Sequence, residues 1–170
     1  DTVRIASGRY HEAVQVHRKA VHIEAASGAD VTFDGTTRVT GWVEDEGRYS
    51  APWSSVFQRV GAPFTTAERP QAGWPEQFFV DGIPLVQVAS LADVAPGSFH
   101  LDVASGRVGI GDDPAGRMVE GSDLSWGIYF NEADGSSLTG VTVQRYATEN
   151  RHMAAVRAYV RRFVPTLRGR

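Results

Sequence analysis

Short runs of alternating apolar and polar residues open the chain. Each contains an apolar pair with one residue between its members: Val3 and Ile5, Val14 and Val16, Val21 and Ile23, Val31 and Phe33. This spacing is the period of a β-strand. Segments 3–16 and 21–34 also match each other, because each holds an apolar pair, an Ala-Ser-Gly corner and a second apolar pair. A repeat this short must stack on its neighbour, so the pattern favours a coil of parallel strands. An antiparallel meander remains an alternative, because it would show the same short alternating strands.

Hairpin signals replace this repeat after the turn at Asp34-Gly35. We therefore predict a β insertion over residues 36–125. Its expected features are a hairpin over 39–53 with an acidic tip at 44–47, a surface loop over 60–76, a tight type I′ turn at Asp81-Gly82, a hairpin over 98–111 and a short strand near Met118-Val119.

The strand pattern resumes near Trp126. Ile128 and Phe130 form an inward pair, and Leu138, Val141 and Val143 form the next strand, so residues 126–160 are expected to continue the coil. The last part is ambiguous. Residues 152–159 fit another strand with Met153 and Ala155 partly inward, whereas the alanines and the three-to-four spacing of Met153, Val156 and Val160 favour a short C-terminal helix. We expect strand in the first half, helix or disorder in the second, and a basic tail over 161–170.

Composition narrows the protein classes. The 170 residues are 42% hydrophobic and carry a formal net charge of −3, which argues against whole-chain disorder and gives no global field for nucleic acid. No apolar run approaches the roughly 20 residues that cross a bilayer, so no membrane partner is expected. Cysteine is absent, which excludes thiol chemistry. The chain begins inside a sequence motif, and we expect a fragment or a product trimmed of its leader.

Three groups of residues invite a chemical interpretation. Glu44-Asp45-Glu46 invites interpretation as a metal site, but acids on a turn are more often solvated. The pair Asp112-Asp113 precedes Pro114, and aspartate is common in turns of this kind, so the turn explains the pair without a catalytic role. His100 alternates with apolar neighbours on a hairpin arm and is expected to face outward as a surface residue. None of these groups predicts a metal or catalytic site.

The opening DTVRIASGRYHEAVQV resembles the first coil of right-handed parallel β-helix proteins of the pectate-lyase-like, carbohydrate-active class. Asp1, Thr2, Val3, Ile5, Gly8, Tyr10, Glu12 and Val16 carry the likeness. The phrases FFVDG, PGSFHLD, GRVGIGDDPAG and VEGSDL extend it to relatives with an antiparallel β insertion between early coils. The resemblance implies an all-β fold, namely a right-handed parallel β-helix of few rungs with a β-hairpin insertion.

The resemblance also shapes the expected function. In such relatives the catalytic carboxylates, or the Lys, Arg and His of the lyases, come from later coils, so no catalytic residue is assigned here. Calcium is frequent among the lyases, yet no ligand set is readable, and no cofactor is identified. We expect the N-terminal fragment of a secreted or cell-surface glycoside hydrolase or polysaccharide lyase, inactive by itself. The alternatives are a non-catalytic carbohydrate-binding or surface-interaction module and a truncated product with residual structure.

A polysaccharide or oligosaccharide is the expected partner. The candidate binding residues are Trp126, Tyr129, Glu132 and Arg145, which would line the sheet face that sugar-active relatives use as a groove. Exposed aromatic rings can stack on sugar rings, but these could also bridge coil and insertion. The terminal arginines more often make a solvated face than a nucleic-acid site. An open coil end exposes strand edges, which makes self-association a further expectation.

Overall fold

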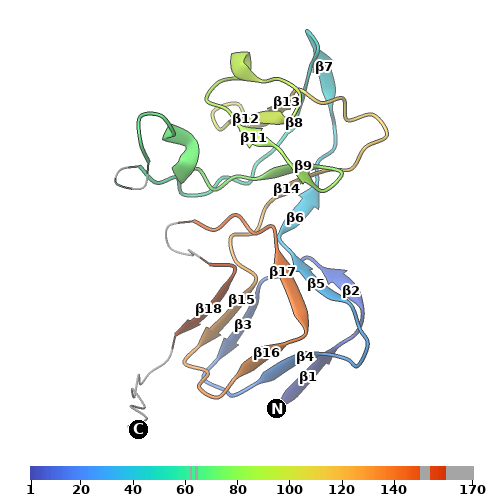
Figure 1. The fold of residues 1–170 in the computed structure, drawn as a ribbon, viewed down its shortest axis with the longest axis vertical. Helices are drawn as coiled ribbons and strands as arrows, with labels where there is room; N and C mark the ends of the chain where they lie inside the picture. The colour runs from blue at the N-terminus through green and yellow to red at the C-terminus, as the bar shows by residue number, and fades with distance from the viewer. Residues whose placement is uncertain (62, 64, 150–153, 160–170) are drawn as a thin grey trace. The chain divides into compact units, whose positions relative to one another are not determined.

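A computed structural model describes residues 1–61, 63, 65–149 and 154–159. These residues are all-β, as predicted, with two short 3-10 turns at Pro70–Gly73 (η1) and Leu91–Asp93 (η2) (Figure 1). None of the helices they form has the length and apolar content for crossing a membrane. The chain divides into two compact units, each described here by itself. Unit 1 holds the described residues of Asp1–Asp34, Gly127–Gln144 and Val156–Arg170, and unit 2 those of Gly35–Trp126 and Arg145–Ala155.

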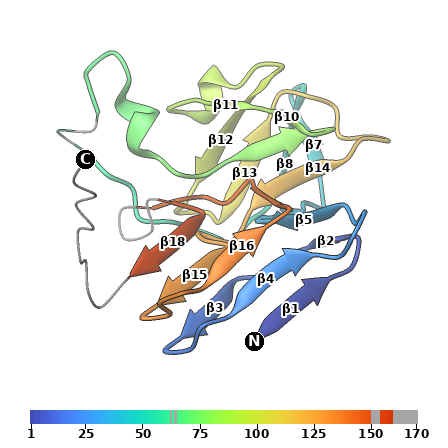
Figure 2. The same cartoon turned by 60° about the horizontal axis from the view of Figure 1, so that its bottom comes forward.

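Unit 1 contains three parallel sheets, which the chain visits in the same order three times. The strands of the three passes are β1 (Thr2–Ile5), β2 (Gly8–Tyr10) and β3 (Val14–His17); β4 (His22–Ala25), β5 (Val31–Asp34) and β15 (Ile128–Asn131); and β16 (Ser137–Thr139), β17 (Val141–Gln144) and β18 (Val156–Tyr159). Sheet A has the order β1-β4-β16, sheet B β17-β5-β2 and sheet C β18-β15-β3 (Figure 1 and Figure 2). Every pairing in these sheets is parallel, which confirms parallel pairing over the meander.

The internal match of segments 3–16 and 21–34 gives the wrong stacking partners for the second apolar pairs. Strand β3 pairs with β15, while β5 pairs with β2. Each pass has three strands, and the two-strand repeat overlooks β2 because Gly8-Arg9-Tyr10 has no aliphatic alternation. Tyr10 supplies the inward contact there, with its ring centroid 5.7 Å from that of Phe33.

The segment with Leu138, Val141 and Val143 is two strands, not the single strand predicted. The chain turns at Gly140, whose φ of +71° suits glycine, and β16 and β17 join different sheets. In the tail, strand is confirmed for Val156–Tyr159. The predicted roles of Met153, of the C-terminal helix and of the basic tail 161–170 fall outside the described residues.

Unit 2 contains two sheets that are antiparallel apart from one pair. Sheet D has the order β10-β9-β14-β6, and sheet E the order β11-β12-β13-β8-β7, in which β11 and β12 run parallel. Their strands are β6 (Thr36–Arg38), β7 (Val43–Asp45), β8 (Arg48–Pro52), β9 (Phe78–Val80), β10 (Ile83–Pro84), β11 (Val86–Gln87), β12 (Ser98–Asp102), β13 (Arg107–Ile110) and β14 (Val119–Ser122).

The three predicted hairpins are confirmed as the antiparallel pairs β7/β8, β9/β10 and β12/β13. Asp81 and Gly82 have φ angles of 51° and 79°, as a type I′ turn requires. The acidic hairpin is tighter than predicted, because its turn is Glu46-Gly47 alone and the two preceding acids lie in β7. The three acids are therefore spread over the strand and its turn and do not cluster at the tip of the hairpin.

A buried apolar cluster holds the two sheets of unit 2 together. It consists of Val39, Ala51, Trp53, Phe78, Val80, Phe99, Leu101, Val108, Ile110 and Val119. Phe78 lies at its centre, with ring centroids 5.0 Å from Trp53 and 4.8 Å from Phe99. His100 alternates with the buried Phe99 and Leu101, as predicted, but it is half-buried and its Nδ1 lies 3.1 Å from the Val88 carbonyl oxygen, so it is less exposed than expected.

Candidate functional site

The outer face of sheet C carries the chemistry most suited to binding. Alternate residues of a strand point to opposite faces, and the buried members of β15, Ile128 and Phe130, mark the inner one. The outer positions form two rows across β3, β15 and β18. We call these six residues the sheet C face: Gln15, Tyr129 and Arg157 in one row, and His17, Asn131 and Tyr159 in the other.

Two aromatic rings and four polar groups share this face. The Arg157 guanidinium lies 4.7 Å from the centroid of the Tyr129 ring, which holds both side chains in place. Tyr159 is 57% exposed. Adjacent strands are about 4.8 Å apart, so each row extends over roughly 10 Å. Rings of this kind present an apolar surface, while amide, imidazole and hydroxyl groups beside them exchange hydrogen bonds with a polar ligand.

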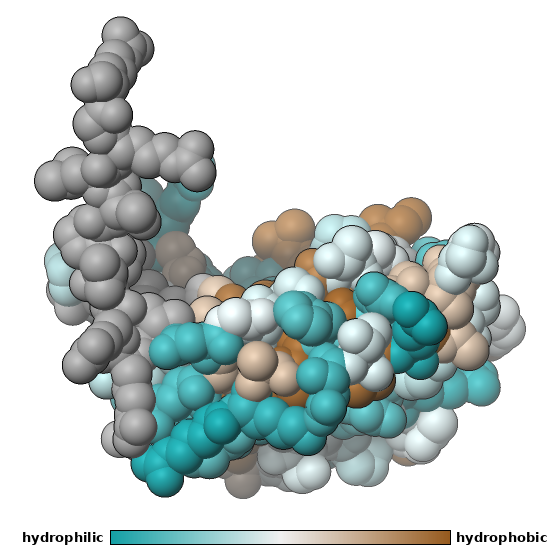
Figure 3. Space-filling view, turned by 90° about the horizontal axis from the view of Figure 1, so that it is seen from below, coloured by the Kyte–Doolittle hydropathy of each residue, from teal (hydrophilic) through white to brown (hydrophobic). Residues whose placement is uncertain are grey.

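The outer face of sheet A is different in character. Its rows contain Thr2, His22 and Ser137, then Arg4, Glu24 and Thr139. Arg4 and Glu24 are tied by an ion pair of 2.7 Å. The view from below, where sheet A lies, is largely hydrophilic with smaller apolar patches (Figure 3).

The outer face of sheet B is also without aromatic rings in the described strands. Arg9, Thr32 and Thr142 form one row, and Gln144 and the fully buried Asp34 lie beyond it. Arg9 Nε lies 3.3 Å from Asp34 Oδ2, and Gln144 Nε2 donates to the same oxygen at 2.8 Å. The buried carboxylate is thus engaged by its own sheet. Among the three parallel sheets, the aromatic outer side chains of the described residues gather on sheet C.

Glu132 stands at the corner that follows β15. Its carboxylate lies 2.8 Å from Arg18 Nε, and both residues have positive φ angles, 51° and 52°. The Glu132 side chain is 17% exposed. Glycoside cleavage needs one carboxylate on each side of the scissile bond. The Glu132 carboxylate at this corner is already paired with the Arg18 guanidinium. Within the described residues, no group of three or more His, Asp or Glu is placed to hold a metal ion.

The four residues predicted from the sequence fall in two units. Tyr129 lies on the sheet C face and Glu132 at its corner, both in unit 1. Trp126 and Arg145 belong to unit 2. Trp126 is half-buried, and Arg145 Nη1 pairs with Glu120 at 2.7 Å while its guanidinium lies 5.2 Å from the ring centroid of Phe79. Their grouping into one site stays a prediction.

Sequence reasoning missed five members of the sheet C face, among them Asn131, which the sequence placed at the corner after Ile128 and Phe130. Gln15 and His17 alternate with the predicted inward valines of β3, but that strand was matched to β5 and not to β15. Arg157 and Tyr159 lie in the segment where strand and helix patterns overlap. The signal that would have found all five is the register of β3, β15 and β18, which the long intervening segments conceal.

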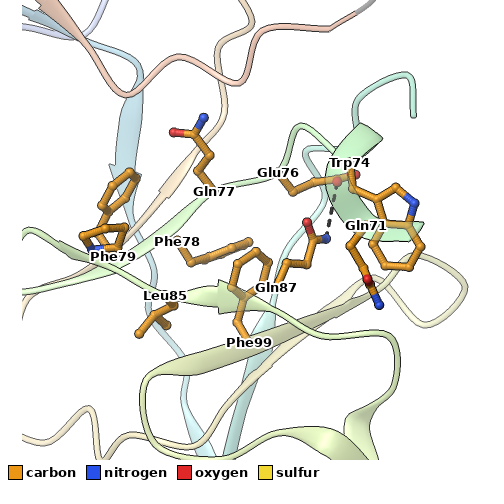
Figure 4. Close-up of a pocket in the computed structure, with 10 residues that line it drawn as sticks. Gln71, Trp74, Glu76, Gln77, Phe78, Phe79, Leu85, Gln87 and Phe99 are labelled. Carbon is orange, nitrogen blue, oxygen red and sulfur yellow. Dashed lines mark hydrogen bonds between the residues drawn. The ribbon is translucent and has the colours of Figure 1, made fainter. Parts of the chain in front are cut away.

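Unit 2 contains a cleft of about 300 Å³ that the sequence did not predict (Figure 4). It opens beside η1 and the strands β9 to β11. Its lining consists of Gln71, Trp74, Glu76, Gln77, Phe78, Phe79, Pro84, Leu85, Gln87 and Phe99. Residues 60–76 read as a surface loop because they lack periodicity, and nothing in that pattern distinguishes Trp74 and Glu76 as neighbours in a cleft.

Comparison with known proteins identifies the fold. No protein family model matches the sequence, and no curated protein matches it. A solved structure described as "The complex structure of XylC with xylose" is similar over 88% of this chain, with a TM-score of 0.69 and 18% sequence identity. Another, described as "Glycoside hydrolase", is similar over 85%, with a TM-score of 0.57 and 10% identity. The chain spans 31% and 43% of the lengths of those two proteins. At these identities the likeness establishes a shared fold.

Proposed function

We propose that this chain is the N-terminal part of a secreted or cell-surface, carbohydrate-active right-handed parallel β-helix protein, and that the sheet C face binds a saccharide. The carrying observation is the gathering of Tyr129, Tyr159 and four polar side chains on one of three parallel sheets. The chain passes three times through three parallel sheets in the same order, which is the arrangement of strands in a β-helix. Both similar structures are described as sugar-bound or as a glycoside hydrolase, which supports this class.

A glycoside hydrolase suits the sheet C face better than a lyase of acidic polysaccharides. The cation on the face, Arg157, lies over the Tyr129 ring, and Arg18 at the corner is paired with Glu132. The ion pair with Glu132 reduces the attraction that the Arg18 guanidinium exerts on a uronate, which leaves Arg157 as the cation of the face. The two catalytic carboxylates that hydrolysis requires would come from later coils, so the chain by itself binds without turnover.

A non-catalytic binding module is the second candidate. The observation in its favour is that Glu132, the carboxylate at the corner of the sheet C face, is held by Arg18. Turnover measurements separate the two candidates. A longer form of the protein that cleaves xylan or a related neutral glycan would establish the hydrolase, and binding without cleavage by that form would establish the module. Cleavage by the present chain would contradict our assignment of the chemistry to later coils.

Glycan-array binding by the chain and by its Tyr129→Ala variant tests the sheet C face. Loss of a ring that packs against a sugar costs about 0.5–1.5 kcal/mol, so affinity should fall by up to about tenfold. Thr142→Ala is the matched control, because Thr142 is an exposed outer residue of sheet B, and should bind normally. Trp126→Ala tests whether the other aromatic residue predicted from the sequence contributes. Equal binding by Tyr129→Ala and Thr142→Ala would exclude the sheet C face as the binding surface.

A further inference from the structure

We propose that the cleft of unit 2 is a second saccharide-binding site, which takes an uncharged sugar. This inference deepens the proposed function and rests on it. The cleft volume of about 300 Å³ lies at the lower end of the range for small-ligand sites. It is formed within unit 2 alone, by η1, the residues that follow it and the strands β9 to β12.

The cleft pairs an indole ring with a carboxylate. Figure 4 shows Trp74 and Glu76 near each other at one end of the cleft, with Gln71 and Gln87 beside them. The indole presents a flat apolar surface of the kind that packs on the C–H face of a pyranose ring. The amides of Gln71 and Gln87 both donate and accept hydrogen bonds, which matches the hydroxyl groups of a sugar, while the buried Glu76 carboxylate holds Arg59 and Gln87 in place.

Glu76 is fixed in position before any ligand binds. Its side chain is 1% exposed, and Arg59 Nε donates to its two oxygens at 3.1 Å and 3.3 Å. Gln87 Nε2 lies 3.5 Å from Oε2, a long hydrogen bond. The same guanidinium lies 4.0 Å from the centroid of the Trp74 ring, so one arginine holds both the carboxylate and the indole. A site whose polar groups are held in place loses little conformational freedom on binding.

The charge of the lining selects against acidic sugars. Among the ten residues that line the cleft, all described, one is a carboxylate and none is Lys, Arg or His. Arg59 is paired with Glu76 and is not part of the lining. A uronate would therefore find no unpaired cation in the lining, whereas a neutral sugar needs only donors, acceptors and an apolar ring.

The side chains of Gln71 and Gln77 make no hydrogen bond to another described residue. They are therefore available for hydrogen bonds with a ligand or with solvent. Trp74 is half-buried, which leaves part of the indole accessible from the cleft. Together with Gln87 these groups give the lining of the cleft the mixed donors and acceptors that a polyhydroxylated ligand needs.

Amide chemical-shift mapping of the whole chain with xylohexaose and, separately, trigalacturonate tests this site. We expect xylohexaose to shift amides in 71–79 and 84–87, and trigalacturonate to shift them little. Trp74→Ala and Gln87→Ala should weaken the xylohexaose response of these amides by about tenfold. Leu91→Ala is the matched control, because Leu91 is 49% exposed and does not line the cleft, and should leave the response unchanged.

Each outcome decides one point. Shifts confined to the sheet C face would overturn the cleft while leaving the proposed function intact. No response at either place would overturn both. Equal responses to the two sugars would overturn the selection for an uncharged ligand. A cleft response retained in Gln87→Ala and in a folded Trp74→Ala would also overturn the site, and the thermal transition of each variant reports whether it is folded.

Discussion

Asp81 forms part of a turn and also accepts two hydrogen bonds from a neighbouring segment of the chain. The sequence predicts its place in the Asp-Gly turn, which the structure confirms. Its carboxylate also accepts hydrogen bonds from Arg117 Nε at 2.8 Å and from the Met118 backbone N–H at 2.9 Å. These two bonds, that from Arg117 first, hold the pKa of Asp81 below its ordinary value. The turn residue thereby ties the β9/β10 hairpin to the start of β14.

The pH dependence of stability follows from this lowered pKa. A carboxyl whose pKa is depressed in the folded state stabilises the protein above its unfolded pKa, and that contribution is lost as pH falls through the folded pKa. Asp81→Asn keeps a turn-compatible residue but removes the charge. The melting temperatures of the variant and the unchanged chain should therefore differ near neutral pH and converge in acid. Asp134→Asn, at an exposed corner, should show no such difference, and a pH-independent gap for Asp81→Asn would contradict the account.

Strand β14 shows what packing decides at the scale of an element. The sequence predicts a strand near Met118-Val119, and β14 runs over Val119–Ser122. Its Gly121 faces the apolar cluster, where a Cβ atom would lie 2.6 Å from Phe78 and 2.7 Å from Trp53. Strand periodicity cannot reveal this close approach, because the two rings come from segments distant in the sequence.

Gly121→Ala should therefore destabilise unit 2. Overpacking of a close-packed core typically costs about 1–3 kcal/mol. Gly61→Ala is the matched control, since an added Cβ there meets nothing within 4 Å and should change stability little. Chemical denaturation followed by tryptophan fluorescence measures both variants. Equal unfolding midpoints would show that the aromatic rings around β14 move aside more easily than their burial indicates.

Hairpins and strands could be predicted because their signals are local. Asp81-Gly82 specifies a turn by its backbone angles, and Ile128 and Phe130 specify an inward face by their alternation. Pairing across long segments could not be predicted in this way. β3 lies beside β15 although more than a hundred residues separate them, and no local pattern in either strand encodes that neighbour.

At the scale of the whole molecule, the same limit applies to the candidate sites. Tyr129 was predicted because it is an aromatic residue on a recognisable strand. The other members of the sheet C face became visible only with the register of three strands, and the cleft only with the packing of a loop beside sheet strands. The sequence thus predicts a saccharide ligand and one residue of the sheet C face, whereas the arrangement of the other side chains on that face depends on tertiary structure.

Saccharide binding by this chain is most directly tested by titration with xylohexaose, followed through the backbone amides of unit 1. We predict saturable shifts concentrated in 14–18, 128–132 and 156–159, the three strands of sheet C and their corners. The amides of sheet A, at 2–5 and 22–25, serve as the internal reference and should move little. No saturable shift in sheet C with xylohexaose or with any other neutral oligosaccharide would contradict the proposal that this face binds a saccharide.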